Sequence, residues 1–434
     1  MTFGAFLLFW GRVSDLYSAK PVFCYGFLVL GFLQLIISFL PDRFSFFILR
    51  AVSGIAGSCL IPSSYRLITA VFEKEELGKA FTLFGMSGAL ANVTGTIAGG
   101  VVAYIPTHGQ GAAWRESKLK ALIPGWFFRI LAMVILPVAL GAMRWIPKPQ
   151  GQIANAQSKL KRLDMVGSLS MLAAVILLVL GLTLGASEGW TSAAFLAPFL
   201  LSWPLFALFF VWEHYLPVEY ALLPSSTWRI PNFAVLIAFA LYIYGFWGVA
   251  FLPIIEISLR VHEESAIVAA LRILPQGIAA GAISVVLTLL PGLVARPRWT
   301  IVIGMIASFI GYALFLQWDE DQVGNRFWWT IFLGGIIGSA GMQAVLTGVN
   351  VTVMTSVDPE MAGVAGAVLQ VSSQVGNAVA LSIQAGLLTV NEGWLYNFAN
   401  VRVSWYFELG WGVVWLIMFM AFYRPRAGRD VEKG

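Results

Sequence analysis

The chain has 434 residues, of which 59% are hydrophobic and 11% are charged, and its formal net charge is +5. An ordinary soluble domain is about 45–50% apolar and about 25% charged, so the composition excludes a soluble globular protein. The positive charge lies mostly between apolar runs, where it indicates orientation relative to a membrane, and no nucleic-acid partner is needed to explain it. Two cysteines, each within an apolar run, exclude a disulfide framework and a cysteine metal cluster.

Apolar runs of about 20 residues recur along the whole chain. A helix rises 1.5 Å per residue, so each such run crosses the roughly 30 Å of hydrocarbon in a bilayer. The sequence therefore predicts an all-α polytopic membrane protein with about twelve complete spans. In chain order the predicted spans are 21–40, 44–70, 80–104, 126–146, 165–186, 192–212, 232–257, 267–291, 299–317, 328–352, 362–390 and 404–423.

Residues 2–10 form a shorter apolar stretch that covers only about half of the hydrocarbon thickness. No Lys or Arg precedes Arg12 and no small-residue cleavage site follows, so the stretch lacks the features of a signal peptide. We interpret it as a partial first span, the second half of a helix whose beginning lies upstream. A protein that is genuinely shortened is the alternative.

The longest polar connection divides the chain into two helical bundles. Basic residues are about twice as frequent on one side of the predicted membrane as on the other, which predicts a cytoplasmic C-terminus. The expected localisation is the plasma membrane, with the vacuolar membrane as the alternative. The predicted units are an N-terminal bundle (1–147), a cytoplasmic linker (148–164), two extra transmembrane helices (165–213), a C-terminal bundle (214–424) and a cytoplasmic tail (425–434).

The loop that follows the first apolar stretch carries a glycine, an acid and a base at fixed spacing. Gly11, Asp15 and Lys20 agree with the cytoplasmic signature of the major facilitator superfamily, which this loop resembles, while Ser18 and Ala19 depart from it. In such a loop a carboxylate can meet a helix N-terminus or an arginine in one conformation and release it in another. A solvated turn is the alternative interpretation.

Arg50 lies inside an apolar span and is followed by Gly54 and Gly57, a pattern that resembles the superfamily's Arg-x-x-x-Gly signature. An arginine at the centre of a span costs about 2.5–3.5 kcal/mol on insertion scales, so it should face protein or a wet cavity. We therefore expect Arg50 to support substrate or proton handling. An arginine that snorkels to the interface is the alternative.

Glycines gather in the span 80–104 and resemble the glycine-rich signature in the fifth helix of the superfamily's drug antiporters. Glycines spaced by four bring backbone against backbone, which suits a helix that repacks between two states; ordinary tight packing explains them equally well. The glycines of this motif are Gly85, Gly88, Gly95, Gly99 and Gly100.

Segments 163–168 and 181–186 look like the two extra helices of the fourteen-span drug:proton antiporter group. Within that group the chain resembles most the fungal branch of aminotriazole-resistance and low-affinity ammonium transporters. The resemblance implies a major facilitator fold in which two bundles rock about a central site. It also implies that the first helix and half of the second are absent from this sequence.

Two C-terminal spans carry polar stripes, each with residues at i, i+4 and i+7, a spacing that places them on one helix face. Buried amides need partners, so each face should meet another helix or water. The resemblance places the first stripe on a cavity-lining helix, where we expect substrate contact, and we expect interhelical hydrogen bonds for the second. The stripes are Gln343, Thr347 and Asn350, and Gln370, Gln374 and Asn377.

Aromatic and acidic candidates complete the predicted site. Tyr242, Tyr244 and Trp247 lie in another span that the resemblance places at the cavity, where they could stack on a planar or cationic solute; packing against lipid is the alternative. Glu256 is the nearest acidic candidate for proton coupling and Glu408 the next. For both, an interfacial carboxylate beside an arginine is the competing interpretation.

These features predict a secondary transporter and no enzyme, because neither a catalytic motif nor a phosphate-binding loop for ATP occurs. The expected activity is proton-coupled export of small organic compounds, by a monomer in the lipid bilayer, without cofactor or metal. Uptake of ammonium or another small nutrient is the first alternative. A non-transporting receptor or an inactive paralogue is the second.

Overall fold

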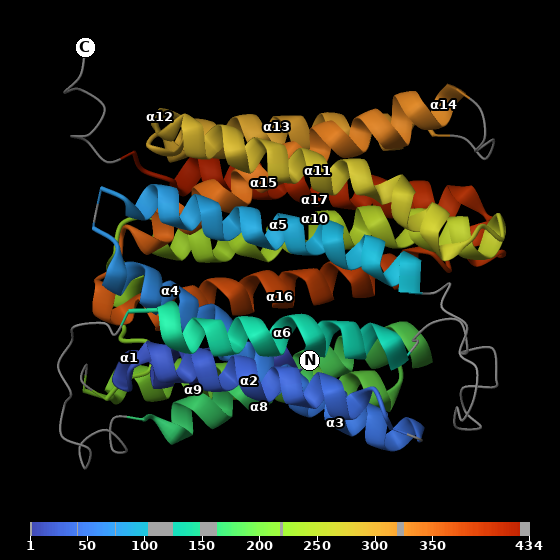
Figure 1. Ribbon diagram of the computed structural model, residues 1–434. Helices are drawn as coiled ribbons and strands as arrows, with labels where there is room; N and C mark the ends of the chain where they lie inside the picture. Colours follow the sequence, from blue (N-terminus) through green and yellow to red (C-terminus); the bar gives the residue numbers. More distant parts are fainter. Residues whose placement is uncertain are drawn as a thin grey trace.

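The computed structural model describes residues 2–40, 42–73, 75–102, 125–147, 163–217, 220–318 and 325–425. Long helices lie side by side along a common direction (Figure 1). Twelve of them are long and apolar enough to cross a membrane, and this confirms the predicted all-α architecture and number of spans. The predicted linker, as far as residue 162, and the tail from residue 426 lie outside the described residues.

The first half of the chain supplies the helices α1 to α9. The predicted span 44–70 is divided into two helices at Cys59, and the reason lies in the sequence: Pro62 has no backbone N–H to donate to the preceding turn. The helices are α1 (Thr2–Leu16), α2 (Ala19–Ile37), α3 (Arg43–Ser58), α4 (Leu60–Val71), α5 (Leu77–Val102), α6 (Gly125–Trp145), α8 (Met165–Glu188) and α9 (Ala193–Tyr215).

The second half is built from α10 to α17. Two of its spans contain a short π-helical segment, η4 (Ile257–Val261) and η5 (Trp328–Phe332), which the apolar pattern does not predict. The longer helices are α10 (Phe233–Glu256), α11 (Ala266–Leu289), α13 (Pro297–Phe315), α15 (Leu333–Met354), α16 (Ala362–Leu387) and α17 (Phe398–Phe422). Short segments join them: η3 (Thr227–Arg229), α12 (Pro291–Val294), α14 (Asn325–Phe327), η6 (Pro359–Met361) and η7 (Trp394–Tyr396).

The two halves meet along two helix pairs. Helix α1 packs on α16, and α5 packs on α11. Glycines bring each pair close together: a Cβ atom placed on Gly11 would lie 2.9 Å from Cβ of Ala367, and one placed on Gly100 would lie 3.1 Å from Cα of Ile267. A side chain at Gly11 would force α1 and α16 apart, and one at Gly100 would require α11 to shift slightly.

Burial is uneven between the two halves. In the most apolar part of α15, 67% of the residues are buried, compared with 19% in α5 and 17% in α6. Many large side chains exposed on α2, α3 and α6, among them Phe32 and Val134, are apolar. A helix surface of this kind is suited to lipid.

Candidate functional site

Polar side chains of α15 face the first half of the chain. Gln343 donates from Nε2 to the carbonyl oxygen of Gly85 in α5, at 3.3 Å. The hydroxyl of Tyr65 in α4 donates to Oδ1 of Asn350, at 2.5 Å. The hydroxyl of Thr347 is buried without a hydrogen-bond partner and lies 3.7 Å from the position of a Cβ atom placed on Gly85. The three residues of the first polar stripe therefore share one face, and that face meets α4 and α5.

The second polar stripe lies on α16 between helices of both halves. Gln370 accepts a hydrogen bond from the hydroxyl of Tyr244 in α10, at 3.1 Å. Gln374 faces α1, where its Cβ lies 3.5 Å from the position of a Cβ atom placed on Gly4. Oδ1 of Asn377 is buried and has no hydrogen-bond partner. This stripe joins α16 to α10 and lies against α1.

The aromatic residues of α10 point in two directions. Tyr244 binds α16, and the indole N–H of Trp247 donates to the hydroxyl of Ser339 in α15, at 3.3 Å. Tyr242 is fully buried on another side of α10, where its hydroxyl lies 2.5 Å from the position of a Cβ atom placed on Gly412 of α17. The expected set of three aromatics is thus corrected to a pair, because at 3.6 residues per turn Tyr242 lies about 200° around the helix from Tyr244 and about 140° from Trp247.

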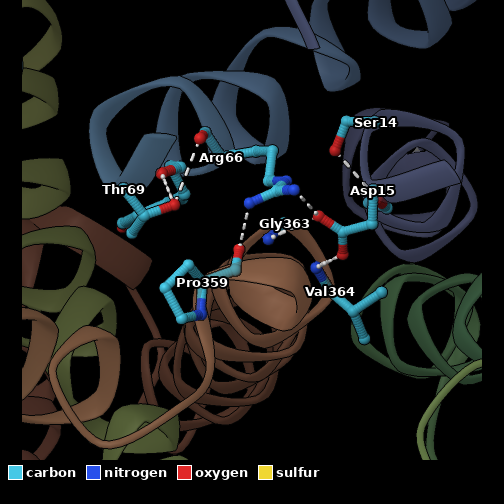
Figure 2. Close-up of polar contacts among 9 residues, drawn as sticks. Ser14, Asp15, Arg66, Thr69, Pro359, Gly363 and Val364 are labelled. Atoms are coloured by element: carbon cyan, nitrogen blue, oxygen red, sulfur yellow. Dashed lines mark hydrogen bonds and ion pairs between the residues drawn. The ribbon is translucent and has the colours of Figure 1, made fainter. Parts of the chain in front are cut away.

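Asp15 joins the end of α1 to the beginning of α16 (Figure 2). Its two carboxyl oxygens accept hydrogen bonds from the backbone N–H groups of Gly363, at 3.1 Å, and Val364, at 2.8 Å. Both groups belong to the first turn of α16, where N–H groups have no partner within the helix and the helix dipole is positive. The Asp15 carboxyl therefore caps a helix of the other half of the chain.

Arg66 of α4 completes this contact. Its Nε lies 3.7 Å from Oδ1 of Asp15, and its Nη1 donates to the carbonyl oxygen of Pro359, just before α16, at 2.5 Å. We call the contacts of Asp15 and Arg66 with residues 359–364 the Asp15 latch. The latch joins the two halves of the chain at one end of the molecule, which we call the Asp15 end.

The Asp15 carboxyl lies beyond the apolar stretch of α1 and is nevertheless buried. Burial raises its pKa from 3.8 to about 7, although the amide groups of Val364 and Gly363 and the charges of Arg66 and Arg12 act in the opposite direction. Asp15 can therefore gain or lose a proton near neutral pH.

Two predicted residues lie apart from these contacts. Arg50 is exposed, and its guanidinium carbon lies 5.6 Å from the centre of the Phe128 ring in α6. The expected role of Arg50 in substrate or proton handling stays a prediction. Glu256 forms an ion pair with Arg260, one turn further on, and both side chains are partly exposed. This is the arrangement of an interfacial carboxylate beside an arginine, which was the alternative interpretation of Glu256.

The glycines of the predicted motifs also differ in their surroundings. Gly85 lies opposite the first polar stripe, and Gly100 lies against α11. A Cβ atom placed on Gly54 would lie 2.4 Å from the hydroxyl of Thr2. No other atom lies within 4 Å of the corresponding positions at Gly95 and Gly99. Close packing thus explains some of these glycines and not others.

A cavity of about 570 Å³ lies among the ends of α5, α11, α13 and α15. Lys79, Arg296 and Arg298 line it, together with the hydroxyl-bearing Thr352. The first polar stripe does not line this cavity. Sequence reasoning missed the cavity, because its residues come from loops and helix ends that are far apart in the chain.

Membrane-spanning helices of the two halves of the chain meet along polar faces and are joined by the Asp15 latch, an arrangement that fits a membrane transporter. The sequence profile of the Major Facilitator Superfamily matches residues 1–381, and the chain belongs to this family. It is a transporter of small molecules and not an enzyme.

Proteins of similar sequence include a puromycin resistance protein and a multidrug transporter. The chain is 27% identical over 399 residues to the puromycin resistance protein pur8 of Streptomyces alboniger, a match that covers 91% of this chain and 73% of that protein. It is 25% identical over 412 residues to the multidrug transporter mfsC of Aspergillus fumigatus, with coverage of 95% and 74%.

Solved structures confirm the major facilitator fold. The human organic anion transporter MFSD10 superimposes with a TM-score of 0.61 at 14% identity, over 96% of this chain and 81% of that one. The proton:xylose symporter XylE superimposes with a TM-score of 0.56 at 13% identity, over 98% and 85%. At these identities the likeness shows the fold alone.

Proposed function

We propose that the chain exports small organic compounds in exchange for protons by alternating access. Relatives named for puromycin resistance and multidrug transport support the outward direction. Within the superfamily we assign the chain to the fourteen-span drug:proton antiporter group and to its aminotriazole-resistance branch, on the resemblance of segments 163–168 and 181–186.

The Asp15 latch is the observation that carries this proposal. It ties α1 and α4 to the start of α16 through hydrogen bonds to helix-end groups, and these can break without loss of any hydrogen bond inside α16. Opening the latch separates the two halves at the Asp15 end while each half stays folded. Such a rigid-body movement about a central site is how inverted-repeat transporters alternate access.

The substrate site in this proposal lies where α15 meets α4 and α5. Gln343, Thr347 and Asn350 offer amide and hydroxyl groups, and Tyr244 and Trp247 offer aromatic surface from α10. Neither polar stripe contains a charged residue. A site of this chemistry is suited to neutral or weakly polar compounds with an aromatic part, because stacking and a few hydrogen bonds fix their orientation.

The topology follows from the same proposal. The Asp15 end is the cytoplasmic one, as the distribution of basic residues predicts, and the C-terminus lies on the same side. The protein acts as a monomer in the plasma membrane. Residues 1–147 and 214–424 form the two moving bundles, and 165–213 form the two extra helices.

Efflux from intact cells tests the direction of transport. Cells that express the chain are loaded with labelled puromycin or aminotriazole, and efflux is followed with and without a proton gradient. Asn350→Ala removes the acceptor of the Tyr65 hydrogen bond and should weaken efflux. Thr183→Ala removes an exposed hydroxyl of α8 and should leave efflux unchanged. Well-expressed protein that produces no gradient-dependent efflux of either compound would contradict export.

A further inference from the structure

Glu408 is an acidic side chain in the interior of the second half of the chain. It lies in α17 and is fully buried, and neither of its carboxyl oxygens has a hydrogen-bond partner among the described residues. It forms no ion pair with any Lys or Arg in the described part of the chain. The sequence offered an interfacial carboxylate beside an arginine as the competing interpretation of Glu408, and the described surroundings contain no such arginine.

The groups that face Glu408 come from three other helices. From α10, Gly245 lies beside the carboxyl: a Cβ atom placed on this glycine would be 3.3 Å from Oε1. Tyr242 of α10 and Tyr312 of α13 are the titratable groups that interact with it electrostatically. From α16, Ala380 packs against Gly245. No cation and no second carboxyl from these helices faces Glu408 in the described structure.

The protonation state follows from these surroundings. An ionised carboxylate away from water and without a cation is costly, and the group takes up a proton instead. The Tyr312 hydroxyl already donates to the carbonyl oxygen of Phe246, at 2.8 Å. The Tyr242 hydroxyl has no hydrogen-bond partner among the residues that the structure describes. It is therefore available to stabilise the Glu408 carboxyl by a hydrogen bond, in the ionised or in the protonated state.

A row of buried polar side chains leads from Glu408 to one end of α17. Asn400, Ser404 and Glu408 are spaced by four residues, so they lie on one face, and all three are fully buried. From α16, Gln384 donates to the hydroxyl of Ser404, at 3.3 Å. The exposed Asn391, which precedes α17, donates to Oδ1 of Asn400, at 2.9 Å.

The other direction along α17 is apolar. One turn beyond Glu408 the same face carries Gly412, packed against the Tyr242 hydroxyl and the Phe309 ring. Phe419 follows two turns later and is fully buried. In the described structure the polar row therefore runs from Glu408 toward the beginning of α17, which lies at the end of the molecule opposite the Asp15 end (Figure 1).

The geometry points to Glu408 as a proton-binding site of this transporter, reached from the end opposite the Asp15 latch through the row of Asn391, Asn400 and Ser404. The inference rests on the proposed proton-coupled export. One proton binds a carboxylate oxygen of Glu408 when the row is hydrated, and the same proton leaves when the halves rearrange. No other bond forms or breaks.

Transport in proteoliposomes separates proton coupling from substrate binding. Glu408→Gln keeps the shape of the side chain and cannot release a proton. We expect it to lose stimulation of labelled puromycin or aminotriazole transport by a pH gradient, while exchange of the same compound at equal pH persists. Glu392→Gln, at an exposed position in the neighbouring loop, should change neither quantity. Gradient stimulation that survives in Glu408→Gln overturns the assignment.

Infrared spectroscopy of the purified protein tests the proton itself. The wild type should show the carbonyl-stretch band of a protonated carboxyl in an apolar environment at neutral pH, and Glu408→Gln should lack it while Glu392→Gln retains it. Absence of the band in the wild type overturns the assignment even where Glu408→Gln does not fold. A wild type that shows the band without gradient-driven transport would contradict the proposed export and leave the proton site standing.

Discussion

Two buried carboxyl groups, Asp15 and Glu408, differ in what surrounds them. Asp15 lies at a helix end, where two backbone N–H groups donate to it and Arg66 lies 3.7 Å away. Glu408 lies in the middle of a helix, where no donor reaches it among the described residues. The first carboxyl is therefore suited to hold two helices together, and the second is suited to hold a proton.

Burial alone therefore does not assign a role to an acidic residue in a membrane protein. A carboxyl with helix-end donors binds another element, and the donors offset part of the cost of burying its charge. A carboxyl without donors stays neutral until the structure around it changes. Gly11→Val, Asp15→Ala and a change of pH test whether Asp15 holds α1 against α16.

The largest effect is expected from Gly11→Val. The new side chain would begin 2.9 Å from Cβ of Ala367 and 3.0 Å from the carbonyl oxygen of Gly363, so α1 could no longer approach α16. We expect transport to be lost. A spin-label pair on Glu73→Cys and Glu360→Cys, at exposed positions across the latch, should report a longer distance. Gly410→Val is the matched control, because no atom lies within 4 Å of its Cβ position.

Asp15→Ala should open the latch without a steric clash. It removes the acceptor of two N–H groups, which destabilises the closed state by about 1–3 kcal/mol relative to the open state. The closed population should fall about 5- to 150-fold relative to the open one, measured with the same spin-label pair. Asp358→Ala removes an exposed carboxyl that caps no helix, and an equal shift in this control would contradict the latch.

The latch should also depend on pH. Burial raises the pKa of Asp15 from 3.8 to about 7 in the closed state, so the closed state binds more protons than an open state in which Asp15 meets water. The stabilisation is complete below pH 3.8 and is lost as the pH rises through about 7. The spin-label distance should therefore lengthen between pH 5 and pH 8 in the wild type. The distance in Asp15→Ala should not change over this range.

The smallest effect is expected from Arg50→Ala. The exposed guanidinium lies over the Phe128 ring, and a cation–π contact of this kind contributes about 0.5–1 kcal/mol. Transport should fall slightly, in parallel with thermal stability. A loss of transport at unchanged stability would support the role in substrate or proton handling that the sequence predicts for Arg50.

Much of the fold could be predicted from the sequence, because membrane spans are long, apolar and bounded by charge. The periodicity of a helix likewise placed Gln343, Thr347 and Asn350 on one face. The partners of that face, Tyr65 and the backbone of Gly85, are more than 250 residues away in the chain, and a helical period says nothing about them.

The remaining differences have local causes. The break between α3 and α4 depends on Pro62, and the orientation of Tyr242 depends on how α10 packs on α17 rather than on its aromatic character. The signature glycine Gly11 and the acid Asp15 indicated a latch. The position of α16, which supplies the donors of that latch, depends on tertiary packing and does not follow from the local sequence pattern.

Transport driven by a pH gradient in proteoliposomes tests whether export is coupled to protons. Purified protein is reconstituted, labelled puromycin and aminotriazole are supplied, and uptake is compared with a pH gradient and without one. The account predicts that each transported molecule moves against a flow of protons, so an outwardly directed proton gradient drives accumulation. Transport that is equal with and without the gradient, or that moves in the same direction as the protons, would contradict it.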